Sequence, residues 1–180
     1  MMKISNYSIR TTIGLVVTAV LILNLGQGIQ IIEKSERNLS LSSLIPHDPI
    51  SITSDNDFEV FPGTGTIEDP YIIEGYNITT EYAGIYIRGT TKYFVISNCY
   101  IDAGDYGIYI WNIANGTATV INNTCNNNKY GIWFDSSGNS TIANNTCSNN
   151  DGYGIYLYFS GSSTITNNTC SNNKYGIYIR

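Results

Sequence analysis

Aromatic rings are the side chains of this sequence best suited to hold a ligand, and they recur at a regular spacing. They take the third position of repeated G-I-Y phrases, and a second series of residues follows two positions later. The first series is Tyr86, Tyr109, Trp133, Tyr156 and Tyr178, and the second is Arg88, Trp111, Asp135, Tyr158 and Arg180. Flat rings along a rigid surface could stack on sugar rings, and polar neighbours could bond their hydroxyls. The first hypothesis is therefore a glycan-binding surface.

A structural explanation of the same rings stays open beside it. Tyrosine favours strands, and cross-strand aromatic pairs stabilise a sheet without any ligand. The two explanations differ in what they require: a glycan-binding surface needs exposed ring faces, whereas a structural wall does not.

Cysteine supplies a second regular series, formed by Cys99, Cys125, Cys147 and Cys170. Ile78 lies six residues before its glycine, as Cys170 does, so we expect these five residues to form one inner stack. We interpret the cysteines as buried free thiols, because a disulfide needs Cβ atoms about 3.8 Å apart that point at each other. Disulfides and a metal site remain alternatives, although no Cys-x-x-Cys or neighbouring histidine supports zinc or copper.

Asparagine forms a third series at Asn122, Asn144 and Asn167. Stacked amides can bond along a ladder and pair with backbone groups of the turns. Each of the three also begins an Asn-x-Thr glycosylation motif, but we expect the structural role to dominate there. The motifs at Asn38, Asn77, Asn115 and Asn139 are expected to be more exposed.

The acidic residues show no regular series. Glycoside hydrolysis normally needs two carboxyl groups about 5–9.5 Å apart. The acids of the repeats are Glu74, Glu81, Asp102, Asp105, Asp135 and Asp151. They lie at different sequence distances from the nearest glycine of a G-I pair. The repeats contain no histidine. We predict no catalytic residues, no metal and no cofactor. The histidine of the chain, His47, is expected to be a solvated loop residue.

These series must be positioned by an internal repeat. The glycines of the G-I pairs are Gly84, Gly107, Gly131, Gly154 and Gly176, which gives intervals of 23, 24, 23 and 22 residues. Each unit carries short strand signals with period two and no helical spacing. A unit this short cannot bury a face alone, but stacked copies can, with each strand pairing in parallel about 4.8 Å from the next. One inner wall is predicted to consist of Ile73, Phe94, Val120, Ile142 and Ile165.

The repeated phrase I-x-N-N-T-C-x-N-N-x-Y-G-I-Y, with the opening segment GTGTIEDPYIIEGYNI at 63–78, resembles right-handed parallel β-helix repeats. The similar group contains carbohydrate-binding proteins, sugar hydrolases and NosD-like proteins, and the resemblance covers residues 58–180. It implies an all-β, right-handed, single-stranded parallel β-helix of about five coils of 22–24 residues. It says little about function, because members share coils rather than a site.

The remaining segments are assigned from composition. Residues 1–28 show the order of a signal peptide, with an uncleaved membrane anchor as the alternative. We expect a linker at 29–50, an N-terminal cap at 51–70 and the repeats at 71–180. Charged residues make up 13% of the chain and the net charge is −5, without a basic cluster. This argues against a nucleic-acid partner.

We therefore predict an exported, secreted or cell-surface β-helix that acts without catalysis, as a scaffold or a glycan-binding module, with a polysaccharide or surface glycan as partner. Two alternatives stay open: a polysaccharide hydrolase or lyase whose site lies in further coils, and a NosD-like factor for maturation of a copper enzyme. The repeat stops at Arg180 without a polar cap. We expect either that further coils follow or that this end stacks on another chain.

Overall fold

Three parallel sheets wind around one core in the larger of two units. The computed structural model describes residues 17–22, 30–35 and 43–180. The chain divides into residues 1–42 and 43–180. In the first unit, β1 (Val17–Ile22) pairs antiparallel with β2 (Gln30–Ser35). Most of the predicted signal peptide and part of the predicted linker lie outside the described residues.

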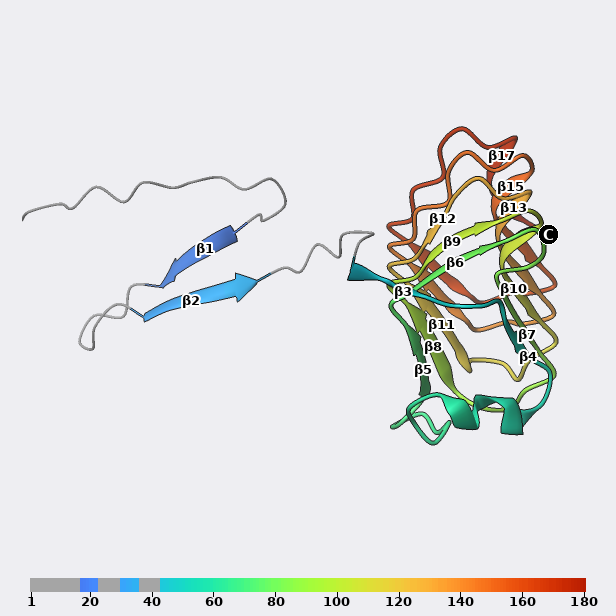
Figure 1. Ribbon diagram of the computed structural model, residues 1–180, viewed down its shortest axis with the longest axis horizontal. Coiled ribbons are helices and arrows are strands. Elements are labelled where there is room, and N and C mark those ends of the chain that lie inside the picture. The colour runs from blue at the N-terminus through green and yellow to red at the C-terminus, as the bar shows by residue number, and fades with distance from the viewer. Residues whose placement is uncertain (1–16, 23–29, 36–42) are drawn as a thin grey trace, which may run out of the picture. The chain divides into compact units, whose positions relative to one another are not determined.

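The coils of the second unit contribute strands to three sheets, and a coil passes through them in the order sheet 1, sheet 2, sheet 3 (Figure 1). Sheet 1 contains β5 (Tyr71–Glu74), β8 (Phe94–Ser97), β11 (Ala118–Ile121), β14 (Thr141–Ala143) and β16 (Thr164–Thr166). Sheet 2 contains β3 (Ile45–Pro46), β6 (Tyr76–Thr80), β9 (Tyr100–Ala103) and β12 (Thr124–Cys125). Sheet 3 contains β4 (Ile50–Ile52), β7 (Ile85–Arg88), β10 (Tyr106–Trp111), β13 (Tyr130–Asp135), β15 (Tyr153–Tyr158) and β17 (Tyr175–Ile179).

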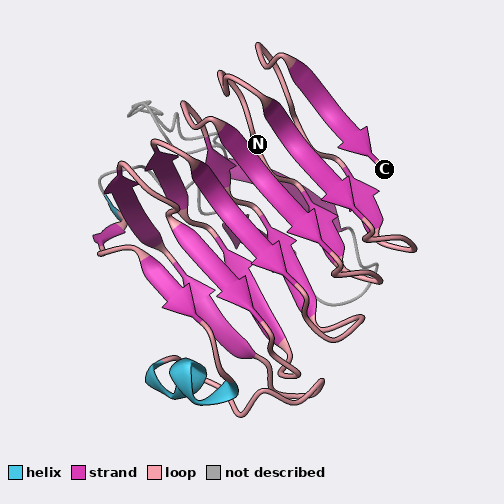
Figure 2. Cartoon of the chain, turned by 90° about the vertical axis from the view of Figure 1, so that its right-hand side faces the viewer, coloured by secondary structure: helices cyan, strands magenta, loops and turns pink. Residues whose placement is uncertain are grey.

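This arrangement confirms the predicted right-handed parallel β-helix of about five coils. Every pairing within the three sheets is parallel, and each strand pairs with its equivalent in the next coil. Figure 2 shows the strands of the solenoid side by side, with a short helix at one end and the C-terminus at the other. Sheet 2 continues past β12 through bridges from Thr124 to Thr146 and from Thr146 to Thr169.

The solenoid begins earlier than the sequence indicated. Ile45 pairs with Tyr76, and Ile50 pairs with Ile85, so residues assigned to a linker form part of a first coil. The segment lacks the repeat phrase, and its strands are only two and three residues long. Strands of this length are too short to show a period-two pattern in the sequence.

The N-terminal end of the solenoid is covered by the 3₁₀ helix η2 (Asp55–Val60), which lies within the segment 51–70. Phe58 is fully buried, and its ring centroid lies 5.1 Å from that of Tyr71 and 5.3 Å from that of Phe94. Asp55 ties the helix to the second coil, because it accepts hydrogen bonds from Thr90 Oγ1 at 2.6 Å and from the Thr91 amide at 3.0 Å. The helix therefore closes the apolar core at this end through Phe58.

The core consists of aliphatic stacks, as predicted, with one change of register. Ile73 aligns with Ile96 and not with Phe94, which aligns with Tyr71. Phe94 still points inward, since positions two apart share a face of a strand. The predicted inner wall is therefore correct in its other members and wrong at Phe94.

The repeated glycines stand at the corner between sheets 2 and 3, where space is limiting. A Cβ atom on Gly131 would lie 2.5 Å from the Gly154 carbonyl oxygen and 3.0 Å from Cys147 Cβ. Gly107 and Gly154 show the same approach in their own coils. The glycine is required because the neighbouring coil occupies the volume that a side chain would need.

Two buried asparagine ladders run along the solenoid, and they are not formed by the residues that the sequence suggested. The first ladder contains Asn123, Asn145 and Asn168, and the second contains Asn128, Asn150 and Asn173. Asn145 Oδ1 accepts from the amide and the side chain of Asn123 at 3.0 and 3.1 Å, and Asn145 Nδ2 donates to the Val120 carbonyl at 2.9 Å. Asn123, Asn145, Asn128 and Asn150 thus each join three coils, and the ladders pair buried backbone groups at the corners.

Asn122, Asn144 and Asn167 lie one position earlier, and their side chains are exposed. Their φ angles of 57°, 56° and 54° place them in the left-handed region, which asparagine tolerates better than most residues. The prediction that these three form the ladder is wrong. Each Asn-Asn pair divides its roles, the first residue making the turn and the second the ladder.

We predict that Asn145→Ala lowers the free energy of unfolding by about 3 kcal/mol, because it leaves several buried backbone and side-chain groups unpaired. Asn144→Gly is the matched control, since it keeps the turn conformation and should change stability by less than about 0.5 kcal/mol. Urea unfolding followed by circular dichroism measures both values. Equal losses in the two variants would contradict the assignment of the ladder.

A second prediction concerns the corner glycine. Gly131→Ala should destabilise the fold by about 2 kcal/mol, because the added methyl group overlaps the next coil. Gly161→Ala is the control, since no atom lies within 4 Å of the position of its Cβ. Thermal unfolding should separate the two variants by several degrees. A Gly131→Ala protein as stable as Gly161→Ala would show that this corner is not closely packed.

Candidate aromatic binding surface

The outer face of sheet 3 carries columns of rings that we call the aromatic wall. The pairing of β7, β10, β13, β15 and β17 brings the predicted first series into register, so that Tyr109 lies between Tyr86 and Trp133. Trp133 in turn pairs with Tyr156, and Tyr156 with Tyr178. We call this first series the inner column of the wall. It arises because period-two alternation directs the flanking aliphatic residues into the core and the rings to the outer face.

An additional column was missed from the sequence. It contains Tyr106, Tyr130, Tyr153 and Tyr175, each directly before a corner glycine. Consecutive centroids lie 5.1, 5.9 and 5.0 Å apart, with interplanar angles of 30°, 20° and 20°. In a regular strand, residues three positions apart lie on opposite faces. The corner at the glycine instead brings each of these tyrosines beside the ring three positions later. The recurring Y-G-I phrase is the signal that could have revealed this corner column.

The rings of the corner and inner columns cover one another. Tyr106 stacks on Tyr109 with a centroid distance of 4.7 Å, and Tyr153 stacks on Tyr156 at the same distance. Trp133 presents its edge to neighbouring rings, with Tyr156 at 4.4 Å and an interplanar angle of 73°. Tyr156 is only 7% exposed. Most faces in these two columns are therefore used in packing, which favours the structural explanation for them.

Burial also changes the chemistry of the phenols. Desolvation, reinforced by the neighbouring Asp105 carboxylate, raises the pKa of Tyr106 to about 12. Desolvation likewise raises the pKa values of Tyr109 and Tyr156. These hydroxyl groups remain protonated in the neutral range, so they can donate hydrogen bonds as well as accept them.

The second predicted series forms an outer column on the aromatic wall, which contains Arg88, Trp111, Asp135 and Tyr158. This column is the more open part of the wall. Trp111 pairs with Arg88 on one side and with Asp135 on the other, and Asp135 pairs with Tyr158. The Arg88 guanidinium lies 5.8 Å from the Trp111 ring centroid, and the Arg180 guanidinium lies 5.8 Å from that of Tyr158. These contacts fall within the range of cation–π attraction. Trp111 is 38% exposed, so the outer column combines accessible rings with donors and a carboxylate.

Four of the six acids of the coils have side-chain partners, and these lie at separate places. Asn98 Nδ2 donates to Glu74 at 2.7 Å, Asn127 Nδ2 donates to Asp102 at 3.2 Å, and Ser136 Oγ donates to Asp135 at 2.8 Å. Asp105 lies 3.8 Å from Lys129 Nζ. Within residues 17–22, 30–35 and 43–180, no group of three His, Cys, Asp or Glu side chains could hold a metal ion.

The cysteines form a shorter stack than predicted. Cys125 aligns with Ile101, and Ile101 aligns with Ile78, so these positions continue into Cys147 and Cys170. Cys99 lies two residues before Ile101, and its amide donates to Asn123 Oδ1 at 3.0 Å. The predicted place of Cys99 in the thiol stack is wrong. Ile101 takes that place, and Cys99 lies in the turn before β9. The interval of 26 residues between Cys99 and Cys125 is longer than one coil because the two cysteines occupy different positions in their coils. Cys99 instead ends the first asparagine ladder.

All four thiols are free, and Cys99, Cys125 and Cys147 are buried. Burial raises the pKa of Cys99 to about 11. Hydrogen bonding to Cys125, together with burial, raises the pKa of Cys147 well above its usual range. A thiolate is the reactive form of cysteine, so these side chains behave as small apolar core residues.

The predicted glycosylation motifs match the expected exposure only in part: Asn115 and Asn139 are exposed, as expected. Asn122, Asn144 and Asn167 are exposed, although they were expected to be held in a ladder. Asn77 is half-buried, and its Oδ1 atom is inaccessible. Asn38 lies outside the described residues.

Comparison with protein families gives one result. The family described as the right-handed β-helix region matches residues 10–180, and the chain belongs to this family. Searches against curated proteins and against solved structures find no match. Among the described residues, no helix is long and apolar enough to cross a membrane.

We predict that Cys99, Cys125 and Cys147 resist alkylation in the native protein at pH 8, because all three thiols are buried, and because the pKa values of Cys99 and Cys147 are raised. After unfolding in guanidinium chloride they should react at the rate of free cysteine. Peptide mass spectrometry after iodoacetamide treatment measures each site. Rapid native labelling of Cys147 would show that the thiol stack opens readily.

Proposed function

We propose that this protein is an exported, non-catalytic β-helix that binds a polysaccharide or surface glycan along its aromatic wall. The observation that supports this proposal is the outer column. It places Trp111, Asp135 and Tyr158 in register on one flat face, about 4.8 Å apart. The rings of Trp111 and Tyr158 lie two coils apart, at about 9.6 Å, and suit an extended sugar chain that runs along the axis of the solenoid.

The packed corner and inner columns contribute rigidity rather than contact area. Tyr106 and Tyr109 support the strand that carries Trp111, and Tyr153 and Tyr156 support the strand that carries Tyr158. A rigid platform loses little conformational entropy on binding. Polar contacts would come from Arg88 and Asp135, which flank Trp111 and can bond sugar hydroxyls as donor and acceptor.

The binding surface can be tested with the double variant Trp111→Ala/Tyr158→Ala. Removal of two ring contacts should weaken glycan binding by about tenfold or more. Affinity electrophoresis against a panel of soluble plant and microbial polysaccharides identifies a ligand, and calorimetry then gives its affinity. Both substitutions lie at surface positions, so the variant should keep the circular dichroism spectrum of the native protein.

Tyr82→Ala is the matched control, because Tyr82 is an exposed ring that lies outside the aromatic wall. It should bind as the native protein does. Equal loss in the control and the double variant would locate binding elsewhere. Release of reducing sugars from any polysaccharide of the panel would contradict the non-catalytic part of the proposal.

A further inference from the structure

Three exposed asparagines line the corner where the chain turns from sheet 1 into sheet 2. They occupy the same position in successive coils, directly after the paired residues of β11, β14 and β16, and they are Asn122, Asn144 and Asn167. We call them the exposed asparagine column. The aromatic wall lies on sheet 3, so this column is a separate feature of the surface.

The side chains of the exposed asparagine column are free. Within residues 43–180, their side-chain amides form no hydrogen bond. The equivalent residue of the preceding coil behaves differently, because Asn98 Nδ2 donates to Glu74 Oε1 at 2.7 Å. Asn98 is followed by Cys99 and Tyr100, so it begins no glycosylation motif. The free amides are therefore those that begin such a motif.

The turn itself does not require an asparagine side chain. It needs a residue with a positive φ angle, and Gly75, which precedes Asn98 in this position, meets that need at 76° without a side chain. Each member of the column is also followed, two residues later, by a threonine that completes an Asn-x-Thr motif. These threonines face outward, because each precedes an inward-facing cysteine, and they are Thr124, Thr146 and Thr169.

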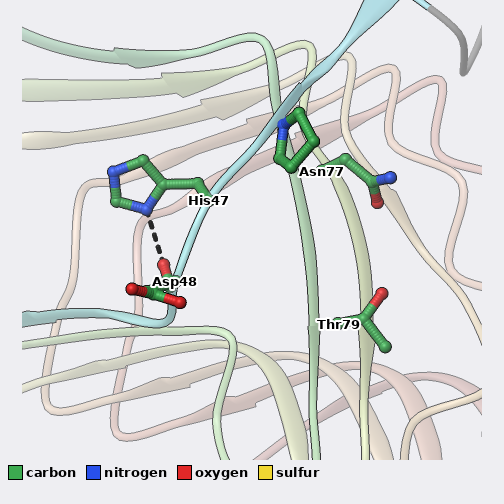
Figure 3. Close-up of a pocket in the computed structure, with 5 residues that line it drawn as sticks. His47, Asp48, Asn77 and Thr79 are labelled. Carbon is green, nitrogen blue, oxygen red and sulfur yellow. Dashed lines mark hydrogen bonds between the residues drawn. The ribbon is translucent and has the colours of Figure 1, made fainter.

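Asn77 begins the same motif inside a strand, and it provides an internal comparison. Figure 3 shows Asn77 and Thr79 on one strand, which is β6. This strand is paired on both sides, since Asn77 lies beside Pro46 in β3 and beside Tyr100 in β9. Asn77 is half-buried, and its Oδ1 atom has no accessible surface. A modifying enzyme could reach this motif only if the sheet opened.

We propose that the exposed asparagine column is a site of N-linked glycosylation, and that adjacent members exclude each other. The inference rests on the export that forms part of the proposed function, and the donor is an oligosaccharide on a polyprenyl pyrophosphate carrier. The transfer forms a bond between asparagine Nδ2 and C1 of the first sugar. It breaks the bond between C1 and the pyrophosphate, which leaves with the carrier, and Nδ2 loses one proton to a base of the transferring enzyme.

Stacking limits how many members can be modified together. Adjacent coils lie about 4.8 Å apart, so Asn122 and Asn167 are separated by about 9.6 Å, with Asn144 between them. A pyranose ring with its substituents is wider than one coil spacing. Glycans on neighbouring coils would therefore compete for the same volume, whereas those on Asn122 and Asn167 leave room for each other.

The test is secretion of the full chain from yeast behind a yeast secretion leader, so that the result does not depend on the proposed export. An N-glycosidase in H₂¹⁸O then marks each modified asparagine for peptide mass spectrometry. Tryptic cleavage after Lys129 and Lys174 keeps Asn144 and Asn167 on one peptide. We expect this peptide with either of the two marked but not with both, and we expect Asn77 to stay unmarked.

Two matched variants test the competition within the column. Asn144→Gly removes the acceptor and keeps the turn, and Thr146→Val removes the hydroxyl group of the motif and keeps a β-branched residue. Either substitution should raise the marked fractions of Asn122 and Asn167, because it removes their competitor. Asn139→Gly is the control, since it removes an exposed motif from another corner and should leave those fractions unchanged.

Three results would overturn the proposal. The first is a column that stays unmarked in the secreted protein, whether or not other motifs are modified. The second is Asn77 marked as fully as the column, which would show that exposure does not select the site. The third is a peptide marked at both Asn144 and Asn167 as often as at one of them, with no rise at Asn122 in either variant.

Discussion

In-register stacking of equivalent residues is the constraint on which the rest of this structure depends. Every parallel pairing in the three sheets places a residue directly beside its counterpart in the next coil. Each position must therefore tolerate a copy of itself about 4.8 Å away. Aliphatic residues and thiols fill the interior under this rule, and asparagine amides bond to one another along the corners. Glycine stands where the neighbouring coil leaves no volume, since a Cβ atom added at Gly131 would lie 2.5 Å from the Gly154 carbonyl oxygen.

The same constraint couples the core to the outer surface. A strand whose aliphatic residues face inward must present its alternate residues outward, so a repeated G-I-Y phrase generates a column of rings as a consequence of core formation. Part of this wall is explained by packing alone, since Tyr156 is nearly buried by other rings. The rings that remain open, such as Trp111, are the ones for which a binding role adds an explanation.

The fold and the candidate surface were predictable from the sequence to different degrees. The period of 22–24 residues predicted the solenoid, the inner column and the outer column. Identical residues that recur at a fixed interval are compatible with few folds other than stacked coils. Assignment within the coil was less secure. Cys99 and Phe94 were placed in the wrong stacks, since the first coils depart from the repeated phrase and a shift of two residues preserves the inward face. The first coil could not be foreseen, because β3 and β4 belong to no visible repeat.

The sequence by itself determined which residue types repeat, and hence that a parallel β-helix forms with rings on one face. Tertiary structure decided which member of each Asn-Asn pair is buried, which rings cover one another, and what closes the N-terminal end. The physical reason is that periodicity specifies neighbours along the axis, one coil to the next. The position of a side chain around the coil depends on turn conformations and corner packing, such as the left-handed φ of Asn144, and these arise only when three sheets close around one core.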